Sequence, residues 1–152
     1  MDDQLVVFRL ATDHYGVGIS AVESIIKMQP ITEVPLAQQF VEGVINLRGK
    51  VVPVIDLRKR FGLGCEQVGK DTRVIVVNAG GVTIGMVVDE VSEVLRVDQG
   101  AVEPPSPVVA TAESAFVRGI AKVDERLIIL LDLGRILTEE QRADLEQIPA
   151  AV

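Results

Sequence analysis

Short aliphatic segments alternate with turns along most of the chain. Several of these segments alternate apolar and polar residues, and the turns between them carry Gly, Asn or Asp, which is typical of β-hairpins. The pattern predicts four hairpins. Their strands are expected at residues 5–10 with 15–19, 41–47 with 50–56, 72–78 with 82–88, and within 116–133 around a turn at Asp124-Glu125.

Three other segments favour helices. A capping-box pattern, SAVE, predicts a short helix over residues 20–27 with Val22 and Ile25 on its buried face. The sequence DEVSEVLRV at residues 89–97 predicts a short helix or an irregular turn. A second capping box, TEEQ, predicts a C-terminal helix over residues 138–148.

The two halves of the chain resemble each other, which indicates an internal duplication. An offset of 69 residues aligns Gly16-Val17 with Gly85-Met86, and Val22 with Val91. An offset of 76 residues aligns Gly43-Val44 with Gly119-Ile120, and Asp56-Leu57 with Asp132-Leu133. The difference between the offsets is one insertion, so we infer a duplicated unit of about five strands.

Five short, Val-rich strands close naturally into a small barrel, because closure removes exposed sheet edges. The expected fold is mainly β: two five-stranded barrels packed together, with short helices and a C-terminal helix. We expect one domain over residues 1–152, with a first subdomain at about 16–82 and a second at about 83–137. Exchange of the N-terminal strand between the two subdomains stays an open alternative.

Composition excludes several classes of function. The net charge is −7 and aromatic residues make up 3% of the chain, which argues against nucleic-acid binding and against an anionic membrane surface. The N-terminus has no signal-peptide pattern, and no apolar stretch is long enough to insert into a membrane. The single cysteine, Cys65, excludes an internal disulfide and fits a reducing compartment. We therefore expect a cytoplasmic protein.

The chain offers little material for catalysis. His14 is the only histidine and lies in an expected hairpin turn, so neither a nucleophile–base pair nor a zinc site is expected. The sequence NAGG at residues 78–81 lacks the spacing of a phosphate loop and is interpreted as a hairpin turn. Asp89-Glu90 is interpreted as a solvated helix start. We expect no cofactor, no metal and no enzymatic activity.

Two repeat-equivalent acids follow apolar strands. Asp56 and Asp132 each stand where a carboxylate could accept hydrogen bonds from the amides of a following helix. A capping role is favoured for both, and contact with a partner is the alternative.

The turn at residues 46–49, NLRG, differs from its repeat equivalent, which reads KVDE. The flanking strands are kept while the turn changes from basic to acidic. A turn that only closes a hairpin needs no such difference, so we infer that Arg48 has a task of its own. A guanidinium suits a carboxylate on a partner, and a solvated arginine is the alternative.

These residues resemble a known family. The sequences FVEGVINLRGKVVPVIDLRKRF, GMVVDEVSEVL and VRGIAKVDERLIILLDL closely resemble the CheW family of bacterial chemotaxis adaptors, from about residue 5 to residue 137. The resemblance implies two five-stranded SH3-like barrels and no enzymatic activity. It implies two partners: the cytoplasmic tip of a chemoreceptor, which is a helical hairpin, and the regulatory domain of a chemotaxis histidine kinase. It also implies recruitment to receptor arrays at the membrane.

The resemblance implies a receptor-binding site in a groove between the barrels. The positions that match the family's receptor-binding residues are Val22, Gly43, Asn46, Arg48, Val87 and Val88. Val87 and Val88 alternate across a strand, so at most one of them is expected to face the groove. Kinase-contacting residues are not assigned. Ser24 departs from the family, whose members often carry an acid at this position.

Two functions from other classes remain as alternatives. An aliphatic groove between barrels could accept a small apolar ligand, although few polar residues converge there in the sequence. A small barrel could also bind single-stranded nucleic acid, which the acidic balance and the scarcity of aromatic residues disfavour.

Overall fold

The computed structural model of the chain describes residues 2–32, 41–60, 69–98, 102–103, 117–123 and 125–136. Strands make up most of these residues, in agreement with the expected mainly β fold. In chain order the elements are β1 (Asp2–Leu10), β2 (Asp13–Gly18), the 3-10 turn η1 (Ile19–Ala21), β3 (Val22–Lys27), β4 (Val41–Leu47), β5 (Lys50–Asp56), α1 (Leu57–Arg60), β6 (Arg73–Ala79), β7 (Val82–Val88), β8 (Glu90–Asp98), β9 (Val102–Glu103), β10 (Val117–Val123), β11 (Arg126–Leu131) and α2 (Leu133–Ile136).

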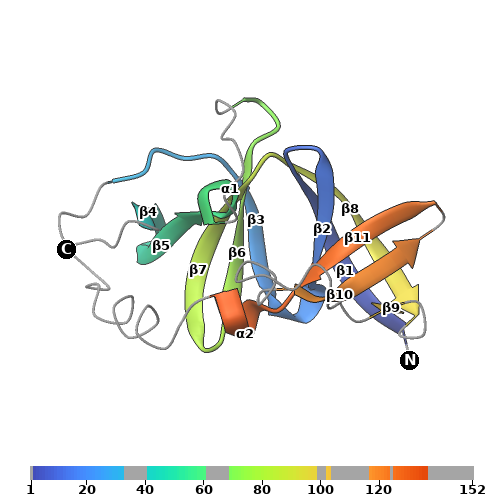
Figure 1. Ribbon diagram of the computed structural model, residues 1–152. Helices are drawn as coiled ribbons and strands as arrows, with labels where there is room; N and C mark the ends of the chain where they lie inside the picture. The colour runs from blue at the N-terminus through green and yellow to red at the C-terminus, as the bar shows by residue number, and fades with distance from the viewer. Residues whose placement is uncertain are drawn as a thin grey trace.

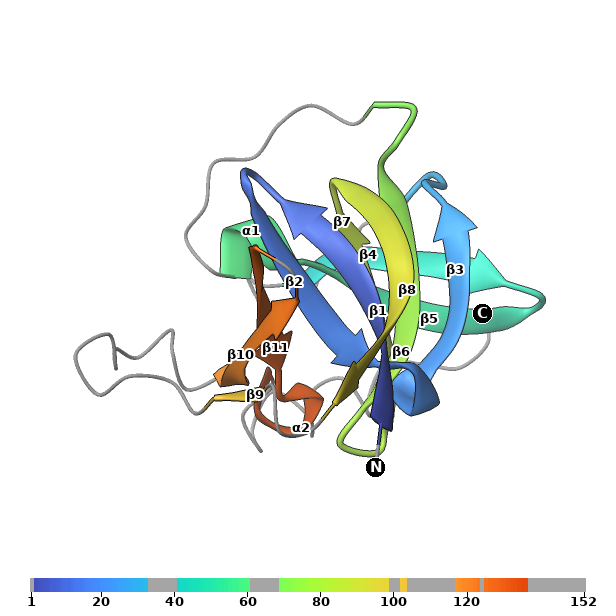
Figure 2. The same ribbon diagram turned by 90° about the vertical axis from the view of Figure 1, so that its right-hand side faces the viewer.

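The strands form two sheets. A five-stranded sheet has the order β3-β6-β7-β5-β4, and a six-stranded sheet has the order β8-β1-β2-β11-β10-β9. Figure 1 shows the five-stranded sheet on the left and the six-stranded sheet on the right. Figure 2, turned by 90°, shows β8 beside β1 and β3 on the right beside β6. Closure of these sheets into SH3-like barrels stays a prediction.

All four predicted hairpins are confirmed. The pairs β1–β2, β4–β5, β6–β7 and β10–β11 are antiparallel, and β4 and β5 begin and end at the predicted residues. These hairpins were predictable because their turns are short and their residue types are specific. The predicted C-terminal helix over residues 138–148 lies outside the described residues.

Two predictions of helix were wrong. Residues 20–27 form the end of η1 and then strand β3, and residues 90–98 form strand β8. Both segments alternate exposed and partly buried side chains, as strands do, and each pairs antiparallel with a strand far away in the sequence. The capping-box residues lie at the 3-10 turn and at the start of β3, where no helix follows. Tertiary pairing therefore overrides the local helical signal.

The pairing registers agree with the inferred duplication. In the five-stranded sheet Val54 pairs with Gly85, and in the six-stranded sheet the equivalent residues, Leu130 and Gly16, pair in the same parallel manner. The β-bulges also correspond, because Glu23 is skipped in the β3–β6 register and Ser92 is skipped in the β8–β1 register. The same backbone arrangement is thus built twice.

The hairpins β1–β2 and β6–β7 are exchanged between the two copies, because β6–β7 lies between β3 and β5 of the first repeat and β1–β2 lies between β8 and β11 of the second. β3 belongs to the first sequence repeat but pairs with β6 of the second, while β8 of the second repeat pairs with β1 of the first. The five-stranded sheet consequently contains the strands from Val22 to Val88, and the six-stranded sheet contains β1, β2 and the strands that follow β7. The division into subdomains at 16–82 and 83–137 stays a prediction.

Three clusters of buried side chains stabilise this arrangement. One cluster lies between the sheets, where Phe8 and Tyr15 pack with residues such as Ile75, Met86 and Val88. A second cluster lies within the six-stranded sheet and a third within the five-stranded sheet. Because β6 and β7 have a core on each face, their burial is nearly continuous rather than alternating. No helix within the described residues is long and apolar enough to cross a membrane.

Gly43 is required in β4 because the backbone of residues 31–32 passes directly against it. Thr32 and Val44 exchange two backbone hydrogen bonds of 2.9 and 2.8 Å, which bring the backbone of Thr32 against Gly43. A Cβ on Gly43 would lie 2.3 Å from the Thr32 carbonyl oxygen, and the Gly43 φ of +149° is unfavourable for other residues. Glycine is therefore the residue that this crossing can accept.

We expect Gly43→Ala to lower the free energy of unfolding by about 2–4 kcal/mol, because overpacking and backbone strain add. Urea denaturation followed by circular dichroism measures the change. Gly69→Ala is the control, since a Cβ there meets nothing within 4 Å and its φ is not in the left-handed region. Equal stability of the Gly43→Ala variant and the native protein would contradict the inferred crowding.

Candidate functional site

The tip of the β4–β5 hairpin is a tight turn held by an asparagine. The Gly49 N–H donates to Asn46 Oδ1 over 2.8 Å. Arg48 has φ +55° and Gly49 has φ +82°, so both central residues of the two-residue loop have positive φ, as a type I′ turn requires. The sequence NLRG thus specifies this turn, with one unusual feature: an arginine in the left-handed region.

The β6–β7 turn shows that the arginine is not needed for this geometry. There the Gly81 N–H donates to Asn78 Oδ1, also over 2.8 Å, and Gly80 and Gly81 have φ +64° and +96°. This confirms that NAGG is a hairpin turn. Glycine fills both strained positions in that turn, whereas Arg48 fills the first one in the β4–β5 turn at a cost of about 1–2 kcal/mol. Strain of this kind that persists points to a function of the side chain.

Arg48 is exposed at the hairpin tip. Within the described part of the chain, neither Arg48 nor the neighbouring Lys50 has an ion pair. The cations of the second hairpin differ, because Arg126 lies 2.6 Å from Glu93 and Lys122 lies 3.1 Å from Glu103. The β4–β5 tip therefore presents positive charge that no described side chain neutralises.

Exposed aliphatic side chains lie on the elements that begin the five-stranded sheet. Ile19 in η1 is 39% exposed and Ile25 in β3 is 42% exposed. Val22 is partly buried and packs against the core between the sheets. This strand thus combines an anchored valine with exposed apolar surface.

The structure places the six predicted site residues in two different environments. Asn46 and Arg48 are exposed and share one turn, and Val22 is partly exposed on β3. Gly43 is buried in β4.

Val87 and Val88 lie inside the protein. Val87 is 1% exposed in the core of the five-stranded sheet, and Val88 is 0% exposed in the core between the sheets. Neither side chain is therefore placed to contact a partner directly.

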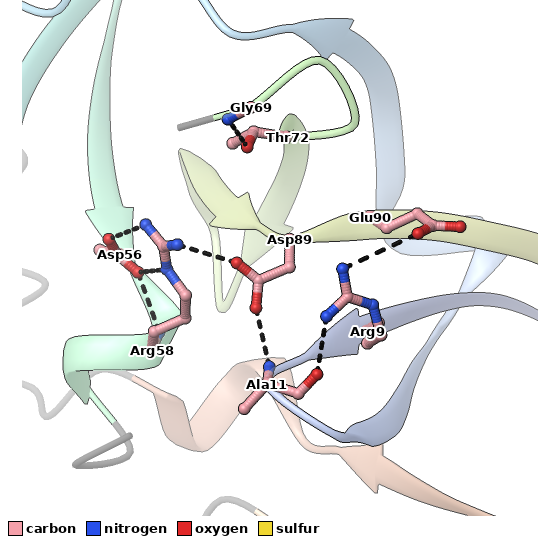
Figure 3. A network of polar contacts seen from close by, with 8 residues as sticks. All are labelled: Arg9, Ala11, Asp56, Arg58, Gly69, Thr72, Asp89 and Glu90. Atoms are coloured by element: carbon pink, nitrogen blue, oxygen red, sulfur yellow. Dashed lines mark hydrogen bonds and ion pairs between the residues drawn. The ribbon is translucent and has the colours of Figure 1, made fainter. Parts of the chain in front are cut away.

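A buried network of charges lies near the junction of the two sheets, and the sequence did not reveal it. Arg58 in α1 donates to both carboxylate oxygens of Asp56, from Nε over 3.0 Å and from Nη2 over 2.8 Å. Its Nη1 donates to Asp89 Oδ1 over 2.8 Å, as Figure 3 shows. The hydrogen bond to Asp56 is the largest cause that raises the pKa of Arg58 above its ordinary value, while burial opposes the rise. The guanidinium stays charged.

Asp89 connects this network to the other sheet. The Ala11 N–H, in the β1–β2 turn, donates to Asp89 Oδ2 over 2.7 Å, and the Asp89 N–H donates to the Arg9 carbonyl over 3.1 Å. Asp89 is 5% exposed, so its interpretation as a solvated helix start was wrong. Its partners lie 31 and 78 residues away in the sequence, which is why local reasoning missed them.

The predicted capping roles of the two repeat-equivalent acids are confirmed. Asp56 Oδ1 accepts the Arg58 N–H over 3.0 Å, and Asp132 Oδ1 accepts the Gly134 N–H over 3.0 Å. Each carboxylate therefore starts the short helix that follows its strand. Only Asp56 also binds a buried guanidinium.

We expect Asp89→Ala to destabilise the protein by about 3–5 kcal/mol, because it removes one partner of a buried ion pair and leaves the Ala11 amide without its acceptor. Chemical denaturation measures the loss. Glu90→Ala is a matched control at the next position, where the carboxylate is exposed and lies 3.8 Å from Arg9. Its expected cost is less than about 1 kcal/mol. Similar costs for the two variants would contradict the role of the network.

Replacing Arg48 by glycine tests whether the hairpin tip is strained. We expect Arg48→Gly to raise the free energy of unfolding by up to about 1 kcal/mol, because relief of the left-handed strain exceeds the added flexibility of the unfolded chain. The reciprocal variant Gly80→Arg should lose about 1–2 kcal/mol in the equivalent turn. Thermal and urea denaturation of both variants provide the measurement. A destabilised Arg48→Gly variant would show that Arg48 stabilises the turn.

Comparison with known proteins agrees with this geometry. A family model of the CheW-like domain matches residues 4–141. The chain is 32% identical over 145 residues to the chemotaxis protein CheW of Klebsiella aerogenes, covering 95% of this chain and 87% of that protein. It is 33% identical over 138 residues to the chemotaxis protein CheW of Bacillus subtilis, covering 91% of this chain and 88% of that protein.

A solved structure is similar in fold and sequence. The crystal structure of the scaffolding protein TtCheW from Thermoanaerobacter tengcongensis superposes with a TM-score of 0.85 at 45% identity, covering 93% of this chain and 96% of that one. The match extends over both sheets, so the resemblance seen in the motifs holds for the whole fold. The chain therefore belongs to the CheW family of chemotaxis scaffold proteins.

Proposed function

We propose that the protein is a non-enzymatic adaptor that couples transmembrane chemoreceptors to a chemotaxis histidine kinase. One surface binds the helical hairpin at the cytoplasmic tip of a receptor, and another binds the regulatory domain of the kinase. Membership of the CheW family supports this function. The observation that carries the receptor site is Arg48, which is exposed, unpaired within the described residues and held in a strained conformation that the turn itself does not need.

The receptor surface combines apolar contact with one directed charge. A helix of the receptor would lay its apolar stripe along β3, where Val22 and Ile25 offer aliphatic surface, and burial of that surface would supply affinity. The planar guanidinium of Arg48 can donate two parallel hydrogen bonds to one carboxylate. Such a contact would fix the register of the helix.

Four members of the site support its shape instead of contacting the receptor. Gly43 permits the crossing of residues 31–32 over β4, and Asn46 holds the turn that displays Arg48. Val87 and Val88 fill the cores on the two faces of β7. These residues would keep the hairpin and β3 in fixed positions, which lowers the entropy that binding must overcome.

Binding of two partners at once explains how an adaptor works without catalysis. An adaptor held at a receptor raises the effective concentration of kinase near that receptor, so modest pairwise affinities can build a stable assembly. In this proposal the adaptor is recruited from the cytoplasm to receptor arrays at the membrane. Rigid attachment of its two sheets would keep the two binding surfaces in a constant relative orientation.

The receptor site is tested by charge reversal at the hairpin tip. We expect Arg48→Glu to weaken co-sedimentation with receptor-containing membranes at least about tenfold, because a directed ion pair becomes a repulsion. The fold should be retained, since Arg48 is exposed. Lys70→Glu, which reverses an exposed cation in the turn before β6, should bind like the native protein. A folded Arg48→Glu variant that sediments normally would exclude the guanidinium from the receptor contact.

A further inference from the structure

The six-stranded sheet contains an ion pair across its open side. Arg126 begins β11 and its Nη1 lies 2.6 Å from Glu93 Oε1 in β8. Because β1 and β2 separate β8 from β11 in the sheet, the pair joins strands that the curl of the sheet brings together. A carboxylate on β8 thus neutralises the cation at the hairpin tip.

The duplication identifies the corresponding positions in the five-stranded sheet. Glu93 corresponds to Ser24 in β3, and Arg126 corresponds to Lys50 at the start of β5. The packing supports this correspondence. Leu95 and Val123 pack against the core of the six-stranded sheet, and their equivalents, Ile26 and Leu47, pack against the core of the five-stranded sheet. The equivalent registers and packing therefore predict that β3 approaches its hairpin tip as β8 does.

The two copies differ in where they place the carboxylate. Val91-Ser92-Glu93 in β8 corresponds to Val22-Glu23-Ser24 in β3, so serine and glutamate have changed places. Glu23 is the residue skipped at the β-bulge, is exposed, and has no ion pair within the described residues. In the first copy the acid is therefore displaced by one residue from the position that pairs with the hairpin cation.

This displacement leaves the carboxylate position equivalent to Glu93 unfilled, beside a cation, Lys50, that has no ion pair within the described ranges. We propose that an Asp or Glu of the bound receptor helix fills this position, forms an ion pair with Lys50 and accepts a hydrogen bond from the Ser24 hydroxyl. This inference rests on the proposed function, because it names the chemistry of the same partner. Arg48 and Lys50 then bind acids of the receptor from one hairpin tip, and Ser24 is the residue that keeps Lys50 available.

The unfilled position is tested first in the protein alone. Ser24→Glu should restore the intramolecular pair and raise the folding equilibrium constant about two- to fivefold. The gain should vanish in the Ser24→Glu/Lys50→Gln double variant, as a double-mutant cycle from urea denaturation would show. The Glu93→Gln/Arg126→Gln cycle calibrates the same pair in the second copy. A gain that persists without Lys50 would overturn the inferred geometry.

The partner is tested with a soluble fragment of a receptor's cytoplasmic helical hairpin. The Ser24→Glu variant should bind the fragment about tenfold more weakly than the native protein does. Its affinity should also depend less on salt concentration, because the new carboxylate already pairs with Lys50. Ser24→Gln, which has the same size and no charge, should bind within about twofold of the native protein. Equal losses in both variants would indicate a steric effect and overturn the inference, as would unchanged binding by Ser24→Glu. Failure of the native protein to bind the fragment would instead overturn the proposed function, and this inference with it.

Discussion

The buried ion pairs of Arg58 with Asp56 and Asp89 join the two sheets of this fold. Asp56 ends a strand of the five-stranded sheet, Asp89 lies between β7 and β8, and Asp89 also binds the β1–β2 turn of the six-stranded sheet. Burial of three charges is costly, and only complete pairing offsets the cost. Within the described residues no buried side-chain nitrogen or oxygen lacks a hydrogen-bond partner. The network therefore favours one relative arrangement of the sheets over looser alternatives.

The exchange of the hairpins β1–β2 and β6–β7 joins the two repeats as well. Each sheet contains strands of both sequence repeats, so neither repeat forms a complete sheet by itself. The apolar cluster between the sheets adds to this attachment. Because stability comes from these features, the β4–β5 hairpin tip can carry a strained Arg48 at a small relative cost. A stable fold thus tolerates a local conformation that would serve binding.

The sequence allowed the hairpins to be predicted but not all of the strands. NLRG and NAGG specify their turns through residues that are neighbours in the chain, so local reasoning was sufficient. β3 and β8 were mistaken for helical segments because a capping box and a few apolar residues fit either structure over so short a length. Only their pairing with β6 and β1, which are distant in the sequence, decides between the two.

The candidate site, like the strands, was only partly predictable from the sequence. The contrast between NLRG and its acidic repeat equivalent identified Arg48, because the comparison needs only the sequence. The burial of both Val87 and Val88 was not predictable, since a strand with a core on each face lacks the alternation that normally separates buried from exposed positions. Arg58 was missed because its second carboxylate is 31 residues away.

The duplication explains how one fold acquires an asymmetric surface. Backbone register, bulges and core positions agree between the copies, because a change there would disturb the packing of many residues. Exposed positions are free of that constraint, and the copies differ at just such places: in the hairpin turn and in the order of serine and glutamate beside the bulge. In the second copy the hairpin cation is neutralised by Glu93 of β8, which stabilises the curled sheet. In the first copy Arg48 and Lys50 have no ion pair within the described residues, and in the proposed function their charges bind a partner instead of stabilising the fold.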